Sequence, residues 1–497
     1  MLVWLLLRRL AIPGAWIAAA LFAFHPVQAE SVAWVTELKN TQSTLFYLLA
    51  VLMWINFLRD EPSNRWSYYS LTLLFSILAL LSKTTACTLP AALLIVPWIQ
   101  GERIGWRRIL QVVPFLVLGI AAGLLSIWWE RHLGNYRQDV GQTLTLVQRA
   151  LIAGHALWFY AGKLLFPVNL TFSYPRWPVD TGNPLNYIWL AGCVAVAFVL
   201  WFWRKTIGRS VIGAIIFFVA ALSPLLGFIP LYTFKYSYVA DHYQYVASIG
   251  MLALGAACLQ RIPRVFSVIL LLALGTLTWR QAHIYQNQTA LWKDTLAKNP
   301  ASWMADDNLG TIFRGEGDFS KAIDYYQKAI SLNPGFAQAH YNLGIVLFKT
   351  GDASEAMDEF QRAIQLDPED ALAYYNYATA LDQSGQADEA AKLYEEAIRL
   401  KPDLTSARIN LGILFGRLGK LDEAMAQFQE VIRLDPDNAG AHNNLGAILR
   451  SKGHLDEAIE QFQDALRIDP DFALARTNLN AALSTKAASE KNSPPLH

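Results

Sequence analysis

Polar residues interrupt the apolar N-terminal half of the chain over residues 22–40, which read FAFHPVQAESVAWVTELKN. One apolar run ends before this loop and another begins after it, so its ionisable groups lie where a membrane span would meet water. Such groups cost free energy to keep there and tend to be functional. We therefore interpret the loop as one wall of an active or binding site, with Glu30, Lys39 and Asn40 as candidate residues.

Three other places carry candidate site residues. Asp241 and His242 lie at the start of an apolar segment, within KYSYVADHYQY, where four tyrosines can bond a carboxylate. Lys83 lies in an apolar stretch and needs a partner or water. Arg131, in the sequence Glu-Arg-His, is a candidate anion contact. We expect these residues to lie on the same side of the membrane as the loop at 22–40.

Each of these residues also has a structural interpretation. Glu30, with Ser31 beside it, fits an interfacial helix cap. Lys39 fits an interfacial lysine that extends its amine to water. Asp241 fits a buried structural carboxylate paired with His242. The sequence leaves both kinds of interpretation open.

Composition places the chain among membrane proteins. Of its 497 residues, 54% are hydrophobic and 16% are charged, and the apolar residues are concentrated in 1–279. A net charge of +1 argues against a nucleic-acid binder. No metal-ligand spacing or nucleotide-binding motif is present, so we expect no metal and no cofactor. The three cysteines lie in apolar runs and form no disulfide framework.

Hydropathy predicts a polytopic membrane domain over residues 1–279. The nine candidate spans are 10–25, 42–58, 67–83, 84–99, 109–129, 186–203, 211–231, 240–259 and 264–279. The segment 146–167 contains cations and a proline and fits a re-entrant or interfacial path. Clusters of Lys and Arg in alternate loops place those loops in the cytoplasm and leave the chain outside after residue 279.

The chain opens with MLVWLLL before two arginines, and seven apolar residues cannot cross a bilayer. We expect either a recorded start that is late, with a segment missing upstream, or a short interfacial stub.

Residues 300–470 carry a 34-residue repeat, the length of a tetratricopeptide (TPR) unit. Prolines mark the period at 300, 334, 368, 402, 436 and 470. We predict five repeats, then a capping helix over 471–484 and a disordered tail over 485–497. Residues 280–299 read as a helical junction or half-repeat without Gly or Pro, which favours a rigid connection.

One asparagine recurs in the first helix of each repeat, and these residues form a column on the concave face of a TPR solenoid. They are Asn308, Asn342, Asn376, Asn410, Asn444 and Asn478. An amide both donates and accepts hydrogen bonds, so the column could hold the backbone of an extended peptide. The alternative is that asparagine is simply common at this position of the repeat. The column resembles the asparagine ladder in the TPR arm of the nucleocytoplasmic O-GlcNAc transferase.

The motifs HPVQAESVAW, LSKTTACTLP and KYSYVADHYQY, followed by TPRs, resemble the transmembrane-and-TPR protein O-mannosyltransferases and their bacterial relatives. The resemblance implies an all-α protein, with a polytopic transmembrane helix bundle followed by a TPR α-solenoid. It implies transfer of a sugar from a polyprenyl-phosphate donor to a hydroxyl of a protein acceptor held in the TPR groove.

The resemblance also assigns roles to the candidate residues. Transfer to a hydroxyl needs a carboxylate that takes the proton, and it needs cations that stabilise the departing phosphate. Glu30 and Asp241 are the catalytic candidates. The donor-phosphate candidates are Lys39, Asn40, Lys83, Arg131 and His242.

The chain departs from the family pattern in three ways. The family has an acidic motif in its first outer loop, and this chain begins after that loop. Leu38 and His242 stand where arginines are expected, and neither side chain replaces a guanidinium on phosphate. The chain is therefore either truncated or an inactive member, and the second hypothesis is a non-enzymatic membrane-anchored scaffold. Plain TPR repeats and the lack of disulfides favour a bacterial inner-membrane protein with its TPRs in the periplasm.

Overall fold

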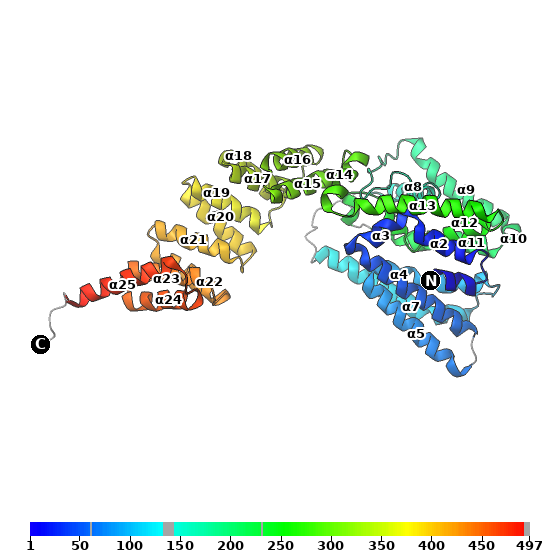
Figure 1. Ribbon diagram of the computed structural model, residues 1–497, viewed down its shortest axis with the longest axis horizontal. Helices are drawn as coiled ribbons and strands as arrows, with labels where there is room; N and C mark the ends of the chain where they lie inside the picture. Colours follow the sequence, from blue (N-terminus) through cyan, green and yellow to red (C-terminus); the bar gives the residue numbers. More distant parts are fainter. Residues whose placement is uncertain (60–61, 133–143, 230–231, 492–497) are drawn as a thin grey trace. The chain divides into compact units, whose positions relative to one another are not determined.

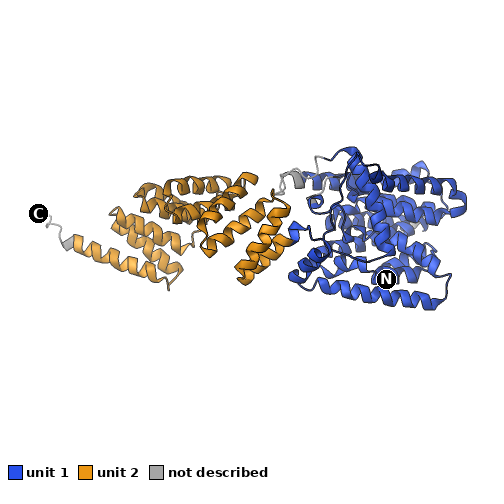
Figure 2. Ribbon diagram, turned by 90° about the horizontal axis from the view of Figure 1, so that it is seen from above, with its two compact units in different colours: residues 1–305 blue, residues 306–497 orange. Residues whose placement is uncertain are grey.

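The computed structural model describes residues 1–59, 62–132, 144–229 and 232–491, and every regular element in these ranges is a helix. The predicted all-α class, with a TPR solenoid in the C-terminal part, is therefore confirmed. The chain forms two compact units, Met1–Ala305 and Asp306–His497 (Figure 2). Each unit is described separately below.

The first unit contains fourteen α-helices in its described residues, joined in places by short 3-10 turns (Figure 1). The helices are α1 (Leu2–Arg9), α2 (Ala15–Phe24), α3 (Ala29–Ala33), α4 (Leu38–Arg59), α5 (Pro62–Ser82), α6 (Leu89–Ile99), α7 (Trp106–His132), α8 (Leu146–Leu165), α9 (Ile188–Phe202), α10 (Arg204–Ile207), α11 (Arg209–Leu222), α12 (Ser248–Leu259), α13 (Arg264–Ile284) and α14 (Gln288–Lys298). Two of the 3-10 turns carry site residues or flank them, and these are η3 (Thr84–Thr88) and η7 (Asp241–Gln244).

Among the described residues, four helical segments are long and apolar enough to cross a membrane. They are Val35–Arg59, Trp106–Trp129, Pro184–Phe202 and Arg264–Ile284. Each of the nine predicted spans contains a helix, but α2, α6, α11 and α12 are shorter than a bilayer crossing normally requires. The segment 146–167, which the sequence marks as re-entrant or interfacial, contains the regular 20-residue helix α8.

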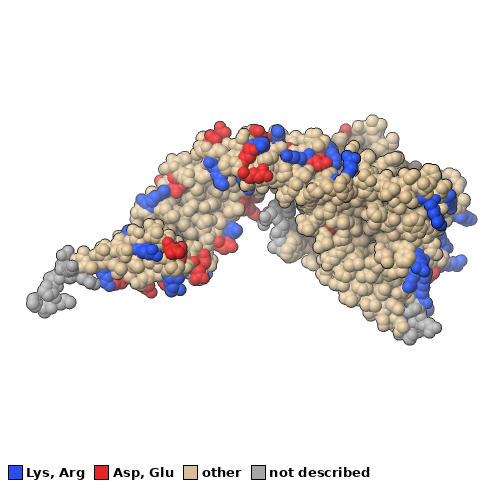
Figure 3. Space-filling view, in the orientation of Figure 1, with Lys and Arg blue, Asp and Glu red and all other residues tan. Residues whose placement is uncertain are grey.

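Basic residues gather at one end of the first unit, on the face seen in Figure 3. At the end of α4, the Arg59 guanidinium donates to the carbonyl oxygen of Arg9, and Arg9 donates to the Asn56 side chain at 3.0 Å. The 22 residues of α4 span about 33 Å, which is close to the hydrocarbon thickness of a bilayer. The opposite end of α4 begins at Leu38, next to Lys39 and Asn40. The predicted assignment of the basic end to the cytoplasm stays a prediction.

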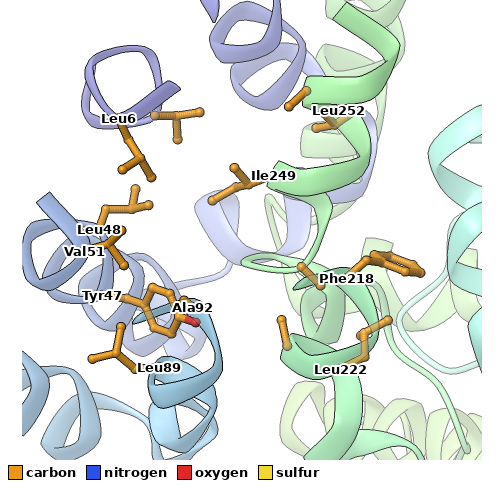
Figure 4. Packing of buried hydrophobic residues seen from close by; sticks show 14 of the residues in the cluster. Leu6, Tyr47, Leu48, Val51, Leu89, Ala92, Phe218, Leu222, Ile249 and Leu252 are labelled. Carbon is orange, nitrogen blue, oxygen red and sulfur yellow. The ribbon is translucent and has the colours of Figure 1, made fainter. Parts of the chain in front are cut away.

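The core of this unit joins helices that are distant in the sequence. Figure 4 shows apolar side chains from α4 and α6 on one side and from α11 and α12 on the other; the labelled residues include Tyr47, Val51, Leu89, Phe218, Leu222 and Leu252. Gly14 precedes α2 with φ +71°, and a Cβ there would lie 2.7 Å from the carbonyl oxygen of Ala256 in α12. Glycine is therefore needed at this close approach.

A buried tryptophan supplies a hydrogen bond that a proline removes from α6. Pro97 lies inside this helix and has no N–H, so the carbonyl oxygen of Leu93 loses its usual partner four residues later. The indole Nε1 of Trp54 in α4 donates to that oxygen at 2.8 Å. Trp54 is fully buried and makes an edge contact with the Phe115 ring in α7. One side chain thus fixes the packing of three helices.

The second unit is built from helix pairs. Its helices are α15 (Trp303–Glu316, which begins in the first unit), α16 (Phe319–Leu332), α17 (Ala337–Thr350), α18 (Ala353–Leu366), α19 (Ala371–Gln383), α20 (Ala387–Leu400), α21 (Thr405–Arg417), α22 (Leu421–Leu434), α23 (Ala439–Ser451), α24 (Leu455–Ile468) and α25 (Ala473–Lys491). The turn glycines adopt positive φ, as at Gly351 with φ +99°. Each second helix buries an alanine and an aromatic ring, as Ala356 and Phe360 do in α18.

Two boundaries differ from the prediction. The last helix continues to Lys491 rather than ending at 484, because the added residues are mostly helix formers and Lys486 pairs with Asp456. Residues 492–497 lie outside the described part. At the junction, α13 and α14 are separate helices, because the Asn287 side chain accepts from Ala290 N at 2.8 Å and caps α14.

We expect Trp54→Phe to lower the free energy of unfolding by about 1–3 kcal/mol, because it leaves the Leu93 carbonyl buried without a donor. Pro97→Ala should recover most of this loss in the double variant, because it restores the backbone N–H. Thermal unfolding in detergent of the wild type, the two single variants and the double variant measures the coupling free energy between Trp54 and Pro97. Purely additive effects would contradict it.

Candidate functional site

The site is built on a contact between Glu30 and His242, which are 212 residues apart. Glu30 lies in the first turn of α3, and its Oε1 is 2.6 Å from Nδ1 of His242 in η7. The Glu30 Oε2 accepts from the backbone N–H of His242 at 3.1 Å. Glu30 is 1% exposed. Instead of capping its own helix, Glu30 binds an unsatisfied N–H at the start of η7.

Asp241 has a different partner. The Tyr174 hydroxyl lies 3.0 Å from both carboxylate oxygens and donates to them. Tyr174 comes from the loop after α8, and its hydroxyl accepts from Thr171 N at 3.3 Å. Asp241 is 2% exposed. The expected pairing of Asp241 with His242 is therefore wrong, because the backbone of η7 directs His242 to Glu30 and Asp241 to Tyr174.

Burial controls the charges of these groups. It raises the pKa of Glu30 to about 8, with a further rise from the negative charge of Glu37. It also raises the pKa of Asp241 well above its usual range, and Glu30 adds to that rise. Burial lowers the pKa of His242 to about 3. At neutral pH the proton therefore resides on Glu30, whose O–H donates to Nδ1 of a neutral His242.

Asp241 is surrounded by groups that favour its ionised form. The Tyr174 hydrogen bond lowers the pKa of Asp241, as do the positive charges of Lys163 and Lys298. These effects oppose the rise caused by burial. Burial is still the largest effect, so the pKa of Asp241 is raised overall, as that of Glu30 is. The two carboxyl groups thus differ in their partners rather than in the direction of their pKa shifts.

The candidate phosphate ligands form a second network. Lys83 Nζ donates to Asn40 Oδ1, and Asn40 Nδ2 donates to Glu37 Oε2 at 2.5 Å. Lys83 and Lys39 lie 3.9 Å and 3.3 Å from the Glu37 carboxylate. The Lys39 side chain is 50% exposed, whereas Lys83 is largely buried. Two lysines thus share one carboxylate, which leaves a net positive charge.

A small polar cavity of about 30 Å³ connects the two networks. Its lining includes Asn40, Lys83, His242, Tyr47 and Thr44. The buried Thr44 Oγ1 has no hydrogen-bond partner among the described residues. This volume holds about one or two water molecules, so a larger group could enter only with part of its surface outside the cavity.

The structure brings together most of the predicted residues. Glu30 joins His242, and Lys83 joins Asn40. The Arg131 side chain lies outside the described part of the structure, so its predicted role stays a prediction. Sequence analysis gave no site role to three residues that the structure adds, namely Glu37, Lys163 and Tyr174. Glu37 stands in the polar loop at 22–40, but no spacing rule indicates its partners or those of Tyr174.

The asparagine column of the second unit links neighbouring repeats. In four of the six residues Nδ2 donates to the residue 35 positions earlier, as Asn376 does to Tyr341 Oη at 3.1 Å. The other pairs are Asn342 with Asp307, Asn410 with Tyr375, and Asn478 with Asn443. Ile409 stands at the corresponding place before Asn444, whose Oδ1 instead accepts from Asn443.

These contacts add a structural role to the predicted peptide-binding role. Asn376 Nδ2 also donates to Leu372 O at 3.0 Å, which uses both of its N–H groups. Its carbonyl oxygen remains the part of the amide that could accept from a peptide N–H. Peptide binding by the column stays a prediction. The oxygens of Asn342 and Asn444 already accept from Arg314 and Asn443, so the acceptor described for Asn376 does not extend to every residue of the column.

Sequence comparison matches the tetratricopeptide repeat family to residues 308–371, 347–411 and 409–473. The C-terminal unit is a TPR solenoid. A protein O-mannosyl-transferase of Caenorhabditis elegans is 25% identical over 339 residues, which are 64% of this chain and 46% of that protein. This chain thus spans less than half the length of that relative.

Solved TPR proteins resemble the solenoid. YrrB, described as a TPR protein with an unusual peptide-binding site, is 28% identical over 37% of this chain and 96% of its own, with a TM-score of 0.34. MamA from Desulfovibrio magneticus RS-1 is 21% identical over 34% of this chain and 97% of its own, with a TM-score of 0.33. A thermophilic TPR protein from Thermus thermophilus is 22% identical over 37% and 99%, with a TM-score of 0.29.

The wild type should lose stability as pH rises, and we expect Glu30→Gln to abolish the part of this loss that is due to Glu30. A raised pKa in the folded state means that folding keeps a proton that the unfolded chain releases, so stability falls between about pH 4.5 and 8. The lowered pKa of His242 has the opposite effect below about pH 6.5 and offsets this fall there. Comparing melting temperatures with the wild type at pH 6.5 and 8 isolates the Glu30 contribution. An unchanged pH slope in the variant would contradict it.

We expect Asn410→Ala to raise hydrogen exchange in α19 and α21 about fivefold, because it removes the bond between the two repeats. Asn444→Ala should have a smaller effect, since Ile409 offers no bond there. Hydrogen exchange of the full chain measures both variants. Equal effects of the two variants would count against the structural role of the column.

Proposed function

We propose that this protein is a membrane glycosyltransferase that moves a sugar from a polyprenyl-phosphate donor to a hydroxyl of a protein acceptor held by the TPR groove. The observation that carries the proposal is a pair of buried acids, Glu30 and Asp241, of which Glu30 contacts His242. His242 lines the cavity together with Lys83 and Asn40. The distant likeness to a protein O-mannosyl-transferase supports the same chemistry. The site contains no cluster of three metal-ligating side chains among the described residues, and the proposal uses no metal.

In the proposed reaction, Asp241 accepts the proton of the acceptor hydroxyl as its oxygen bonds to the sugar carbon. The bond from that carbon to the phosphate oxygen breaks, and its electron pair leaves with the lipid phosphate. Lys83, with Lys39 nearer to solvent, stabilises the negative charge of the leaving phosphate. The Glu30 carboxyl stays protonated and hydrogen-bonded to His242, so it remains neutral during the reaction.

The donor lipid explains why the site lies at the end of the spans. A polyprenyl chain remains in the bilayer, so its phosphate reaches a protein group only near the interface. Asn40 and Lys39 stand in the first turn of α4, whose other end carries Arg59 of the basic end. We therefore place the site and the TPR solenoid outside the cytoplasm, in the periplasm if the protein belongs to a bacterial inner membrane.

A membrane-anchored TPR scaffold is the second candidate, and one observation favours it. Glu30, Asp241 and Lys83 each have a partner within the protein, on His242, Tyr174 and Asn40. Internally satisfied polar networks can serve to specify a fold without chemistry. In that case the site residues would matter for stability alone, and the solenoid would supply the function.

Transfer by the full chain in proteoliposomes, with a polyprenyl-phosphate sugar and a Ser/Thr-rich acceptor, tests the proposal. We expect Asp241→Asn to lose at least about 100-fold in rate, because general-base catalysis contributes that much. Glu30→Gln imitates the protonated acid and should stay within about tenfold of wild type. Glu102→Gln, an acid paired with Arg108 at the basic end, is the matched control. No transfer by the wild type would favour the scaffold, whereas full activity of Asp241→Asn would reject Asp241 as the base.

A further inference from the structure

The loop at 170–174 is fixed on one side by α14, the helix that precedes the TPR solenoid in the chain. Lys298 Nζ donates to Leu170 O at 2.7 Å, and Asn299 Nδ2 donates to Ser173 O at 3.1 Å. The Trp292 ring makes an edge contact with the Phe172 ring at 5.2 Å. All of these contacts lie within the first unit.

The same loop faces the site on its other side. Its last residue, Tyr174, is buried and donates to both oxygens of Asp241. The ring of Tyr174 is held by an edge contact with Phe159 at 4.8 Å, and Lys163 Nζ lies 5.1 Å from its centre. The loop therefore connects α14 to the carboxylate through five residues.

We infer that α14 positions the proposed catalytic carboxylate: Lys298 and Asn299 hold the loop, and the loop holds Tyr174 on Asp241. These three residues are positioning residues rather than catalytic ones. The inference rests on the proposed function for the role of Asp241. The mechanical connection itself is independent of any activity.

The physical reason is the cost of burying a carboxylate. Among the described residues, Tyr174 provides the side-chain donor to Asp241, and without it the ionised acid would be buried with one fewer hydrogen bond. Lys298 acts in two ways, since it binds the loop carbonyl and its charge also favours ionised Asp241. Asn299 acts through the loop carbonyl of Ser173. Variants of the two residues thus separate the mechanical and electrostatic contributions.

Hydrogen exchange of the full chain tests the mechanical connection without requiring activity. Asn299→Ala should increase exchange about fivefold in peptides covering 168–176 and also in those covering 238–245, since it removes one buried bond. Gln288→Ala, an exposed amide at the other end of α14, is the matched control and should change neither. Faster exchange in 168–176 alone, or in neither segment, would overturn the inference.

The pH profile of transfer tests the link to chemistry. Tyr174→Phe removes the hydroxyl that lowers the pKa of Asp241, so the acid limb of kcat should move to higher pH. A merely structural role would lower kcat at all pH values without moving the limb, and that result would overturn the positioning role. Absence of transfer in the wild type would reject the proposed function, while the exchange result would still decide whether α14 holds Asp241.

Discussion

The structure of the first unit depends on how it keeps two carboxyl groups buried at the edge of an apolar helix bundle. An isolated buried carboxylate is costly, so such groups either take up a proton or acquire donors. Burial raises the pKa of both groups, and each has a partner: Glu30 contacts His242, and Asp241 accepts from the Tyr174 hydroxyl. Each acid requires a partner from a distant segment: His242 in η7 for Glu30, and Tyr174 in the loop after α8 for Asp241.

The same requirement explains the short elements between the long helices. At the start of η7, the backbone N–H of His242 donates to the Glu30 carboxyl. Glu37, just before α4, and Asn40, in the first turn of α4, both contact Lys83, so a lysine in an apolar surrounding gains an opposite charge and an amide. Trp54 solves the equivalent problem inside the bundle, where a proline leaves a carbonyl unpaired. Satisfied buried polar groups thus contribute, beside apolar packing, to which segments meet.

The two units manage their polar groups differently. In the first unit, buried polar contacts join segments far apart in the sequence. In the solenoid, the contacts repeat at a separation of 35 residues, so each repeat is linked to the one before it. A regular array can therefore be extended by copying one unit. The interruption at Ile409 shows that a single missing bond does not break the helix pattern.

The sequence by itself determined the all-α class, the 34-residue repeat and the position of most site residues at the ends of apolar segments. These features are local, because helical periodicity, repeat spacing and polar interruptions are properties of neighbouring residues. The pairings were decided by the tertiary structure: His242 on Glu30 rather than on Asp241, and Tyr174 on Asp241. A pairing depends on which segments the fold brings together, and these can be about two hundred residues apart in the sequence. In a short turn such as η7, no sequence periodicity indicates which way each side chain points. For the same reason the column of asparagines was evident from spacing, whereas its bonds to the preceding repeat appeared only when the helices were packed.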